Sequence, residues 1–255
     1  MLRVASWASR PADFSFVIRC CAASSARAWR VASVRWRPSS GGTQLKHKFH
    51  ETASFIVTNT TDTGAGSLRQ ALADAAASPG ADTITFDAAL SGQTIRSEIL
   101  VLAGSANVSA FVIEDTDGVT IDALSLPAGF TITKANPTDA CRLFYIKPAG
   151  KIALHGLTLA NAGGAMPGST DTTLPGGCIF SEGNLTLNRC TLNGNVGNVG
   201  GALYTGGTAN LTQCTITANI ADTGAGIYNA GALNVIHCTI AENAAESVAG
   251  GVYAN

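Results

Sequence analysis

Residues 200–219 read GGALYTGGTANLTQCTITAN, and residues 224–243 read GAGIYNAGALNVIHCTIAEN. The two stretches share one pattern of glycines, an aromatic residue, Cys-Thr-apolar and asparagine, and they are 24 residues apart. The pattern also occurs from Gly176 and starts once more at Gly250. Its recurring members are Phe180, Tyr204, Tyr228 and Tyr253; Cys190, Cys214 and Cys238; Leu192, Ile216 and Ile240; and Asn195, Asn219 and Asn243. A fixed period of this length indicates a solenoid, in which each repeat is one structural unit.

Two solenoids compete for this period. The spacing of Leu187, Cys190, Leu192 and Asn195 also matches the strand half of a leucine-rich repeat. Such a repeat needs helix-forming residues in its second half, whereas residues 200–208 here are rich in glycine, which terminates helices. Each period instead offers three short strands separated by turns, near 202–204, 209–212 and 214–216. The sequence therefore favours an all-β, right-handed parallel β-helix with three short strands per coil.

Stacking of coils explains which residues recur. One coil cannot bury its apolar side alone, so neighbouring coils pair in parallel and share a core. Equivalent positions then fall above one another, which places Leu192 on Ile216 and Cys190 on Cys214, with the intervening threonines facing out. We expect the asparagines to lie in a turn, in left-handed backbone geometry, and to hydrogen bond from coil to coil.

The two ends of the repeat region carry different signals. Ser67 is a helix N-cap candidate, followed by apolar residues at helical spacing up to Pro79-Gly80, which predicts a short helix over 67–77 that caps the first coil. Residue 255 falls in the middle of a coil, so we expect the domain at 51–255 to be truncated at its C-terminus. An open coil edge exposes strands that could pair with another chain, so self-association there is expected.

The first 50 residues differ sharply from the rest. They carry nine Lys or Arg against the single acid Asp13, and the chain as a whole has a net charge of −1. A boundary near residue 50 follows. This basic leader is poor in acids, as transit peptides are, and it has no uninterrupted apolar run of a secretory signal. We interpret it as a disordered segment or as sequence upstream of a wrongly assigned start.

Little in the sequence points to catalysis or to a bound ion. The repeat cysteines show no C-x-x-C spacing, so a zinc site is not expected. We expect them to be packed free thiols, with disulfides between adjacent coils as the alternative. Only 13% of all residues are charged, and the five charged residues of 176–255 are Glu182, Arg189, Asp222, Glu242 and Glu246. The densest acidic group, Glu114-Asp115-Thr116-Asp117 with Asp122, is interpreted as a solvated turn, with calcium binding as the alternative. His155 and His237 are expected to be ordinary side chains. We expect no catalytic residue and no cofactor. We also expect no nucleic-acid partner, because the basic leader contains no recognisable nucleic-acid-binding motif.

The chain resembles a known group of proteins in two places. Residues 57–95 (VTNTTDTGAGSLRQALADAAASPGADTITFDAALSGQTI) look like the entry segment of bacterial surface β-helix proteins, and the repeats resemble the GGAIY-type coils of polymorphic outer-membrane proteins and pectin-lyase-like folds. The resemblance implies a non-catalytic cell-surface or secreted scaffold for adhesion or display, with a carbohydrate or another cell surface as partner. Any membrane anchor would lie outside the given sequence. The alternative is an enzyme of the same fold that degrades acidic polysaccharide, either a lyase or a glycoside hydrolase.

Overall fold

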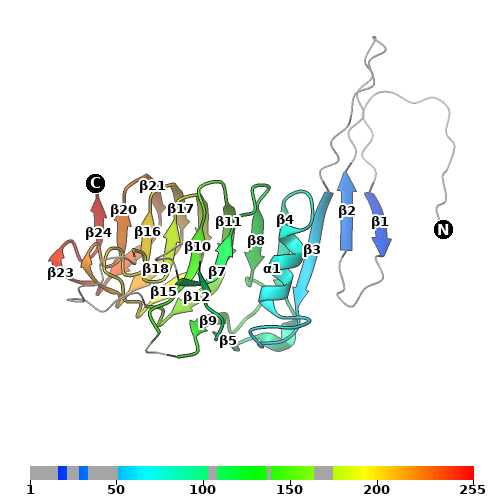
Figure 1. Ribbon diagram of the computed structural model, residues 1–255, viewed down its shortest axis with the longest axis horizontal. Coiled ribbons are helices and arrows are strands. Elements are labelled where there is room, and N and C mark those ends of the chain that lie inside the picture. The colour runs from blue at the N-terminus through cyan, green and yellow to red at the C-terminus, as the bar shows by residue number, and fades with distance from the viewer. Residues whose placement is uncertain (1–16, 22–28, 34–50, 103–107, 137–138, 164–174) are drawn as a thin grey trace, which may run out of the picture.

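The chain folds into an all-β parallel β-helix, as the repeat predicted (Figure 1). The computed structural model describes residues 51–102, 108–136, 139–163 and 175–255, and the backbone of 17–21 and 29–33. Successive coils stack along the long axis of the molecule, with the first strands of the domain at one end and the C-terminus at the other. Each repeat coil contributes one short strand to each of three sheets.

The sheets are named A to D. Sheet A contains β1 (Val17–Cys21), β2 (Trp29–Ser33), β3 (Glu51–Val57), β4 (Asp82–Phe86), β8 (Val119–Asp122), β11 (Lys151–His155), β14 (Asn184–Asn188), β17 (Thr208–Thr212) and β21 (Ala232–Ile236). Sheet B contains β5 (Thr94–Ser97), β9 (Phe130–Lys134), β12 (Leu157–Ala160), β15 (Thr191–Asn193), β18 (Thr215–Thr217) and β22 (Thr239–Ala241). Sheet C contains β6 (Val101–Leu102), β7 (Val108–Ile113), β10 (Arg142–Ile146), β13 (Ile179–Ser181), β16 (Leu203–Thr205), β20 (Ile227–Asn229) and β24 (Val252–Ala254). Sheet D is the pair β19 (Ile220–Thr223) and β23 (Ala244–Val248).

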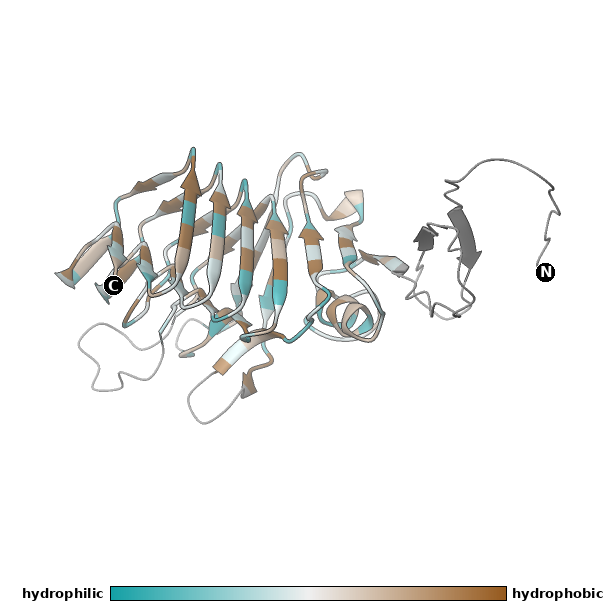
Figure 2. Ribbon diagram, turned by 90° about the horizontal axis from the view of Figure 1, so that it is seen from above, coloured by the Kyte–Doolittle hydropathy of each residue, from teal (hydrophilic) through white to brown (hydrophobic). Residues whose placement is uncertain are grey.

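The register between coils is the 24-residue period of the sequence. Leu192 lies opposite Ile216, and Ile216 lies opposite Ile240. The same shift relates Leu187 to Leu211 in sheet A. Equivalent apolar side chains therefore form continuous columns, and the buried ones belong to a single core that runs through the described part of the chain. Figure 2 shows the resulting alternation of hydrophobic and hydrophilic residues along the strands of sheet A.

The helix expected over 67–77 is present as α1 (Leu68–Ala76). The hydroxyl of Ser67 accepts a hydrogen bond from the backbone N–H of Gln70, as an N-cap residue does. Leu68, Ala71 and Ala75 are buried, and the helix packs against β3, β4 and β8. The β3 coil has no partner strand in sheets B and C, which begin later in the chain, so α1 covers the apolar side of sheet A there. A single turn of 3₁₀-helix, η1 (Ala88–Leu90), follows β4.

The turns correct one expectation about the asparagines. Asn195, Asn219 and Asn243 do not adopt left-handed geometry; the residue before each of them does. These preceding residues are Gly194, Ala218 and Glu242, with φ of 64°, 54° and 56°. The asparagine side chain thus stabilises the turn by hydrogen bonding, and the left-handed geometry belongs to the residue before it.

Two expectations concern the ends of the chain. Strands β1 and β2 pair antiparallel with each other, and β2 pairs antiparallel with β3. The rest of residues 1–50 lies outside the described residues, so the interpretation of the leader stays a prediction. At the other end, Val235, Ile236 and Val252 of the last coil are exposed; self-association through this edge also stays a prediction.

Candidate functional site

A column of aromatic rings runs along the outer face of sheet C. It joins Tyr145, Phe180, Tyr204, Tyr228 and Tyr253, and we call it the aromatic ladder. Neighbouring ring centroids are 5.2, 5.0, 5.2 and 4.8 Å apart in that order. Strand residues alternate, so Tyr204 is half-buried on the outer side while Leu203 and Thr205 on either side of it are fully buried. Tyr228 and Tyr253 are also half-buried, whereas Tyr145 and Phe180 are buried. The sequence had located four of these rings by their spacing and missed Tyr145, which lies outside the repeated blocks.

The ladder ends in a polar group at Tyr145. Its hydroxyl donates to Oε2 of Glu182 at 2.6 Å. The guanidinium of the buried Arg142 lies over the ring of Phe180, 5.0 Å from its centroid. Burial, followed by the hydrogen bond to Glu182, raises the pKa of Tyr145 to about 12. Burial lowers the pKa of Arg142 to about 10. At neutral pH, Tyr145 is therefore a neutral hydroxyl and Arg142 a cation.

The ladder presents ring edges rather than ring faces. Three of the four neighbouring pairs are stacked, and the rings of Phe180 and Tyr204 are tilted by 50°. The faces of Tyr228 are therefore covered on both sides, and a bound molecule meets ring edges and tyrosine hydroxyls there. Tyrosine offers an apolar body together with a hydroxyl that both donates and accepts hydrogen bonds. Three of these side chains, Tyr204, Tyr228 and Tyr253, are half-buried and repeat once per coil. The arrangement suits a polar ligand that itself repeats.

A second column consists of the asparagines at the turn after sheet B. Nδ2 of Asn195 donates to Oδ1 of Asn219, and Nδ2 of Asn219 donates to Oδ1 of Asn243, at 2.9 and 2.8 Å. Asn195 and Asn219 are fully buried. Their amides therefore satisfy each other inside the stack, and this column is structural rather than a surface for ligands.

The repeat cysteines form a third column, at the corner between sheets A and B. Cys190 and Cys214 are buried, Cys238 is half-buried, and all three are free thiols. The thiol of Cys214 donates to the carbonyl of Thr212 at 3.3 Å, and the backbone N–H of Cys214 donates to Sγ of Cys238 at 3.3 Å. The two other cysteines with described side chains, Cys141 and Cys178, are buried in the core. Burial raises the pKa of both, that of Cys141 to about 11.

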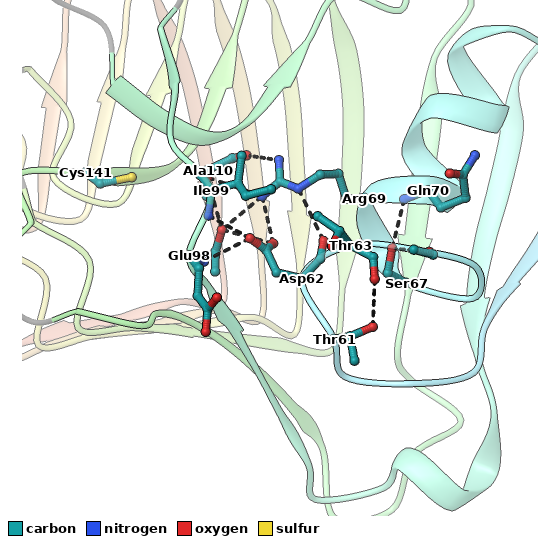
Figure 3. A network of polar contacts seen from close by, with 12 residues as sticks. Thr61, Asp62, Thr63, Ser67, Arg69, Gln70, Glu98, Ile99, Ala110 and Cys141 are labelled. Atoms are coloured by element: carbon teal, nitrogen blue, oxygen red, sulfur yellow. Dashed lines mark hydrogen bonds and ion pairs between the residues drawn. The ribbon is translucent and has the colours of Figure 1, made fainter.

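A polar network near α1 was not anticipated from the sequence (Figure 3). The carboxylate of Asp62 accepts hydrogen bonds from the backbone N–H groups of Glu98 and Ile99 and forms an ion pair with Arg69 at 2.7 Å. Arg69 also donates to the carbonyl of Ala110 and lies over the ring of Phe111. It thereby ties the loop before α1 to sheets B and C. The sequence signal that could have indicated this network is an acidic residue, Asp62, shortly before the helix and an arginine, Arg69, in its first turn.

The carboxylates of the acidic group suggested as a calcium site each take part in a hydrogen bond or an ion pair with another part of the protein. Oδ1 of Asp115 accepts from the backbone N–H groups of Asp117 and Gly118, and Oδ1 of Asp122 accepts from that of Leu124. The carboxylate of Asp117 accepts from the N–H of Gly80, and Glu114 forms an ion pair with Lys147. Across the ranges that the structure describes, no group of three or more His, Cys, Asp or Glu side chains is arranged to hold a metal ion.

His155 and His237, the two histidines among the described residues, belong to no such group. His155 is half-buried in sheet A, between Asp122 and Asn188 of the neighbouring coils. His237 is exposed and adopts left-handed geometry, with φ of 53°, at the corner between sheets A and B.

Comparison of the chain with protein-family models, with curated proteins and with solved structures finds no match. The described residues include no helix with the length and apolar character needed to cross a membrane. The architecture itself defines the class, an all-β parallel β-helix with one helix near the start of the domain.

Proposed function

We propose that the protein is a non-catalytic β-helix scaffold at a cell surface or in the extracellular medium, and that it serves adhesion or display. The observation that carries this proposal is the aromatic ladder, a stripe of stacked rings that continues across five strands of sheet C. A rigid stack of coils holds these rings at a constant spacing without ordering any flexible loop. Rigid aromatic side chains contribute binding area at a low cost in conformational entropy.

We propose an extended carbohydrate as the partner. A polysaccharide presents repeated hydroxyl groups, and the ladder presents one hydroxyl per coil at Tyr204, Tyr228 and Tyr253, which can donate to them and accept from them. The low charge of the repeats supports a neutral ligand better than a strongly charged one. The exposed side chain of Glu182 accepts a hydrogen bond from Tyr145 and places a negative charge at one end of the ladder.

A polysaccharide-degrading enzyme is the second candidate, and the grouping of Arg142, Tyr145 and Glu182 is the observation that favours it. Three features of the group weigh against an enzyme. A hydrolase of the common kind needs two carboxyl groups flanking the substrate, about 5 to 9.5 Å apart, and this group holds one. With its pKa raised to about 12, Tyr145 is a poor general base at neutral pH. Arg142 is also too deeply buried for a polymer to reach.

Binding and cleavage are tested on the same material. Beads coated with the protein are mixed with a panel of neutral and acidic polysaccharides and with intact cells, and retention is measured. We expect retention on part of the panel, and a loss of at least tenfold for the double variant Tyr204→Ala and Tyr228→Ala. The matched control, Asn210→Ala with Asn234→Ala, changes two exposed positions of sheet A in the same two coils and should bind like the unmodified protein.

The outcomes separate the two candidates. Chain cleavage of pectate or alginate by the purified protein would refute the non-catalytic proposal. Retention that the tyrosine double variant and the control variant weaken equally would show that the ladder is not the binding surface. A protein that retains nothing from the panel and no cells would refute the adhesion proposal.

A further inference from the structure

The tyrosines of the aromatic ladder repeat at one fixed interval along the stack. Tyr204 and Tyr228 lie opposite each other in adjacent strands of sheet C. Their ring centroids are 5.2 Å apart and their ring planes differ by 7°, and Tyr253 continues the series at 4.8 Å. Because the strands are in register and the first two rings are nearly parallel, the hydroxyls at their tips keep about the same interval. We call these three side chains the tyrosine row.

Small residues border the tyrosine row on both sides. Gly206 and Ala230, two positions after the first two tyrosines, are exposed. Ala202 and Gly226, two positions before the same tyrosines, are buried. No side chain at these four positions extends beyond a methyl group, so the ring tips stand above the backbone beside them. A long molecule can therefore lie lengthwise along the row, in contact with ring edges and hydroxyls.

The coils that carry the tyrosine row favour an uncharged ligand. Residues 200–241 contain no Lys or Arg, and their single acidic residue is Asp222. Glu182 adds an exposed negative charge at the Tyr145 end of the ladder. An acidic polymer would find no cation in these coils to pair with, and like charges that face each other are unfavourable. A neutral polymer would instead meet hydroxyls that both donate and accept hydrogen bonds.

Extended β-1,4-linked polysaccharides match both the interval and the chemistry of the row. In a β-1,4-linked glucan the two glycosidic bonds of each ring are equatorial, so the chain is a flat ribbon in which each sugar advances by nearly the length of one coil. Equatorial hydroxyls line the edges of this ribbon at the same interval. In α-1,4-linked and β-1,3-linked glucans the chain curves into a helix, and successive hydroxyls do not stay in step with a straight row.

We propose that the tyrosine row binds one neutral β-1,4-linked polysaccharide chain lengthwise along the stack, with one sugar unit beside each coil. This inference rests on the proposed function, that the ladder binds carbohydrate, and it adds the linkage, the charge and the direction of the ligand. The hydroxyls of Tyr204 and Tyr228 hydrogen bond with hydroxyls of consecutive sugars. The coils hold both tyrosines in place before binding, which lowers the entropic cost of ordering them.

Three glucan hexasaccharides that differ only in their linkage test the proposal. They are cellohexaose, which is β-1,4-linked, maltohexaose, which is α-1,4-linked, and laminarihexaose, which is β-1,3-linked. Calorimetric titration of the full chain measures the Kd of each sugar. We expect cellohexaose to bind at least tenfold more tightly than either of the other two.

Two variants that each remove one hydroxyl locate the binding surface. Tyr228→Phe keeps the ring and its stacking, so cellohexaose should bind about two- to tenfold more weakly, as the loss of one hydrogen bond implies. The matched control is Thr215→Val, which removes a hydroxyl from a half-buried position next to the buried Ile216 in sheet B. This control should bind cellohexaose like the unmodified protein.

Several results would overturn the proposal. One is an equal Kd for the three hexasaccharides, or tighter binding of maltohexaose or laminarihexaose. Another is an equal loss of affinity in Tyr228→Phe and Thr215→Val. If cellohexaose does not bind but the polysaccharide panel is retained in a way that depends on Tyr204 and Tyr228, the inference fails and the proposed function stands. If nothing in the panel is retained either, both fail.

Discussion

Oδ1 of Asn219 accepts two hydrogen bonds from Asn195 in the coil before it, from the backbone N–H and from Nδ2, each at 2.9 Å. The amide of Asn219 in turn donates to the carbonyl of Leu192 and to Oδ1 of Asn243. One buried side chain therefore satisfies polar groups of three successive coils. The hydrogen bonds of Asn219 at the turn after sheet B therefore connect successive coils and not residues of one coil.

Asn219→Leu removes these hydrogen bonds between coils and keeps the side-chain volume nearly constant. It leaves the buried N–H and Nδ2 of Asn195 without their acceptor, and each unsatisfied buried group costs about 1 to 3 kcal/mol. We expect the free energy of unfolding to fall by about 2 to 5 kcal/mol on that basis, measured by urea denaturation. Asn193→Ala is the control: its amide makes one long contact of 3.4 Å, to the Thr217 carbonyl, from a half-buried position. A loss in the control equal to that in Asn219→Leu would contradict the argument.

Leu192→Asp places a charge inside the column that Leu192, Ile216 and Ile240 form. Leu192 is fully buried in a column of apolar side chains, where the charge of an aspartate would lose its hydration. We expect the variant to lose the strand signal in circular dichroism and to become sensitive to protease. Thr191→Asp, on the adjacent outward position, should fold normally. A soluble and well-folded Leu192→Asp would show that the inward register is wrong.

Ala218→Gly should stabilise the protein. Ala218 is exposed and has φ of 54°, a left-handed geometry that costs a non-glycine residue about 1 to 2 kcal/mol. Glycine also has greater conformational freedom in the unfolded chain, which lowers the free energy of unfolding. The net stabilisation expected is therefore about 0.5 to 1 kcal/mol.

The preceding coil already holds glycine at this place, which supplies the reverse test. Gly194→Ala should destabilise, because the new Cβ would adopt φ of 64° and lie 3.1 Å from Oδ1 of Asn161. Thermal melting of both variants checks the pair. Shifts of the same sign would contradict a common origin in backbone geometry.

The stability of the protein should fall at alkaline pH through Tyr145. The pKa of this hydroxyl is raised from an ordinary value of 10 to about 12 in the folded protein, so folding favours the neutral form. This contribution is complete below pH 10 and is lost as the pH rises from 10 towards 12. Tyr145→Phe cannot ionise, so its unfolding free energy should decline less over that interval. Parallel curves for the two proteins, from denaturation at pH 9 to 12, would contradict the assignment.

The repeat made most of the fold predictable, because a fixed period dictates both the stacking and the register. The columns of Leu192 and of Cys190 could be placed from spacing and alternation alone. The backbone geometry at Asn195 could not, since asparagine tolerates both conformations and Ala218, which does adopt the left-handed one, carries no signal for it. The contact of Asp62 with Glu98 and Ile99 joins residues far apart in the sequence, and no local pattern encodes it.

The constant register makes the coil a unit of insertion and deletion. Removing residues 195–218 would bring Gly194 next to Asn219, which joins a left-handed turn residue to an asparagine as in the intact chain. Each column would lose one member and keep its neighbours in line, and the stack would shorten by about 4.8 Å. Gain or loss of whole coils could therefore change how many tyrosines the protein displays while the turns, the core and the spacing of the display stay the same.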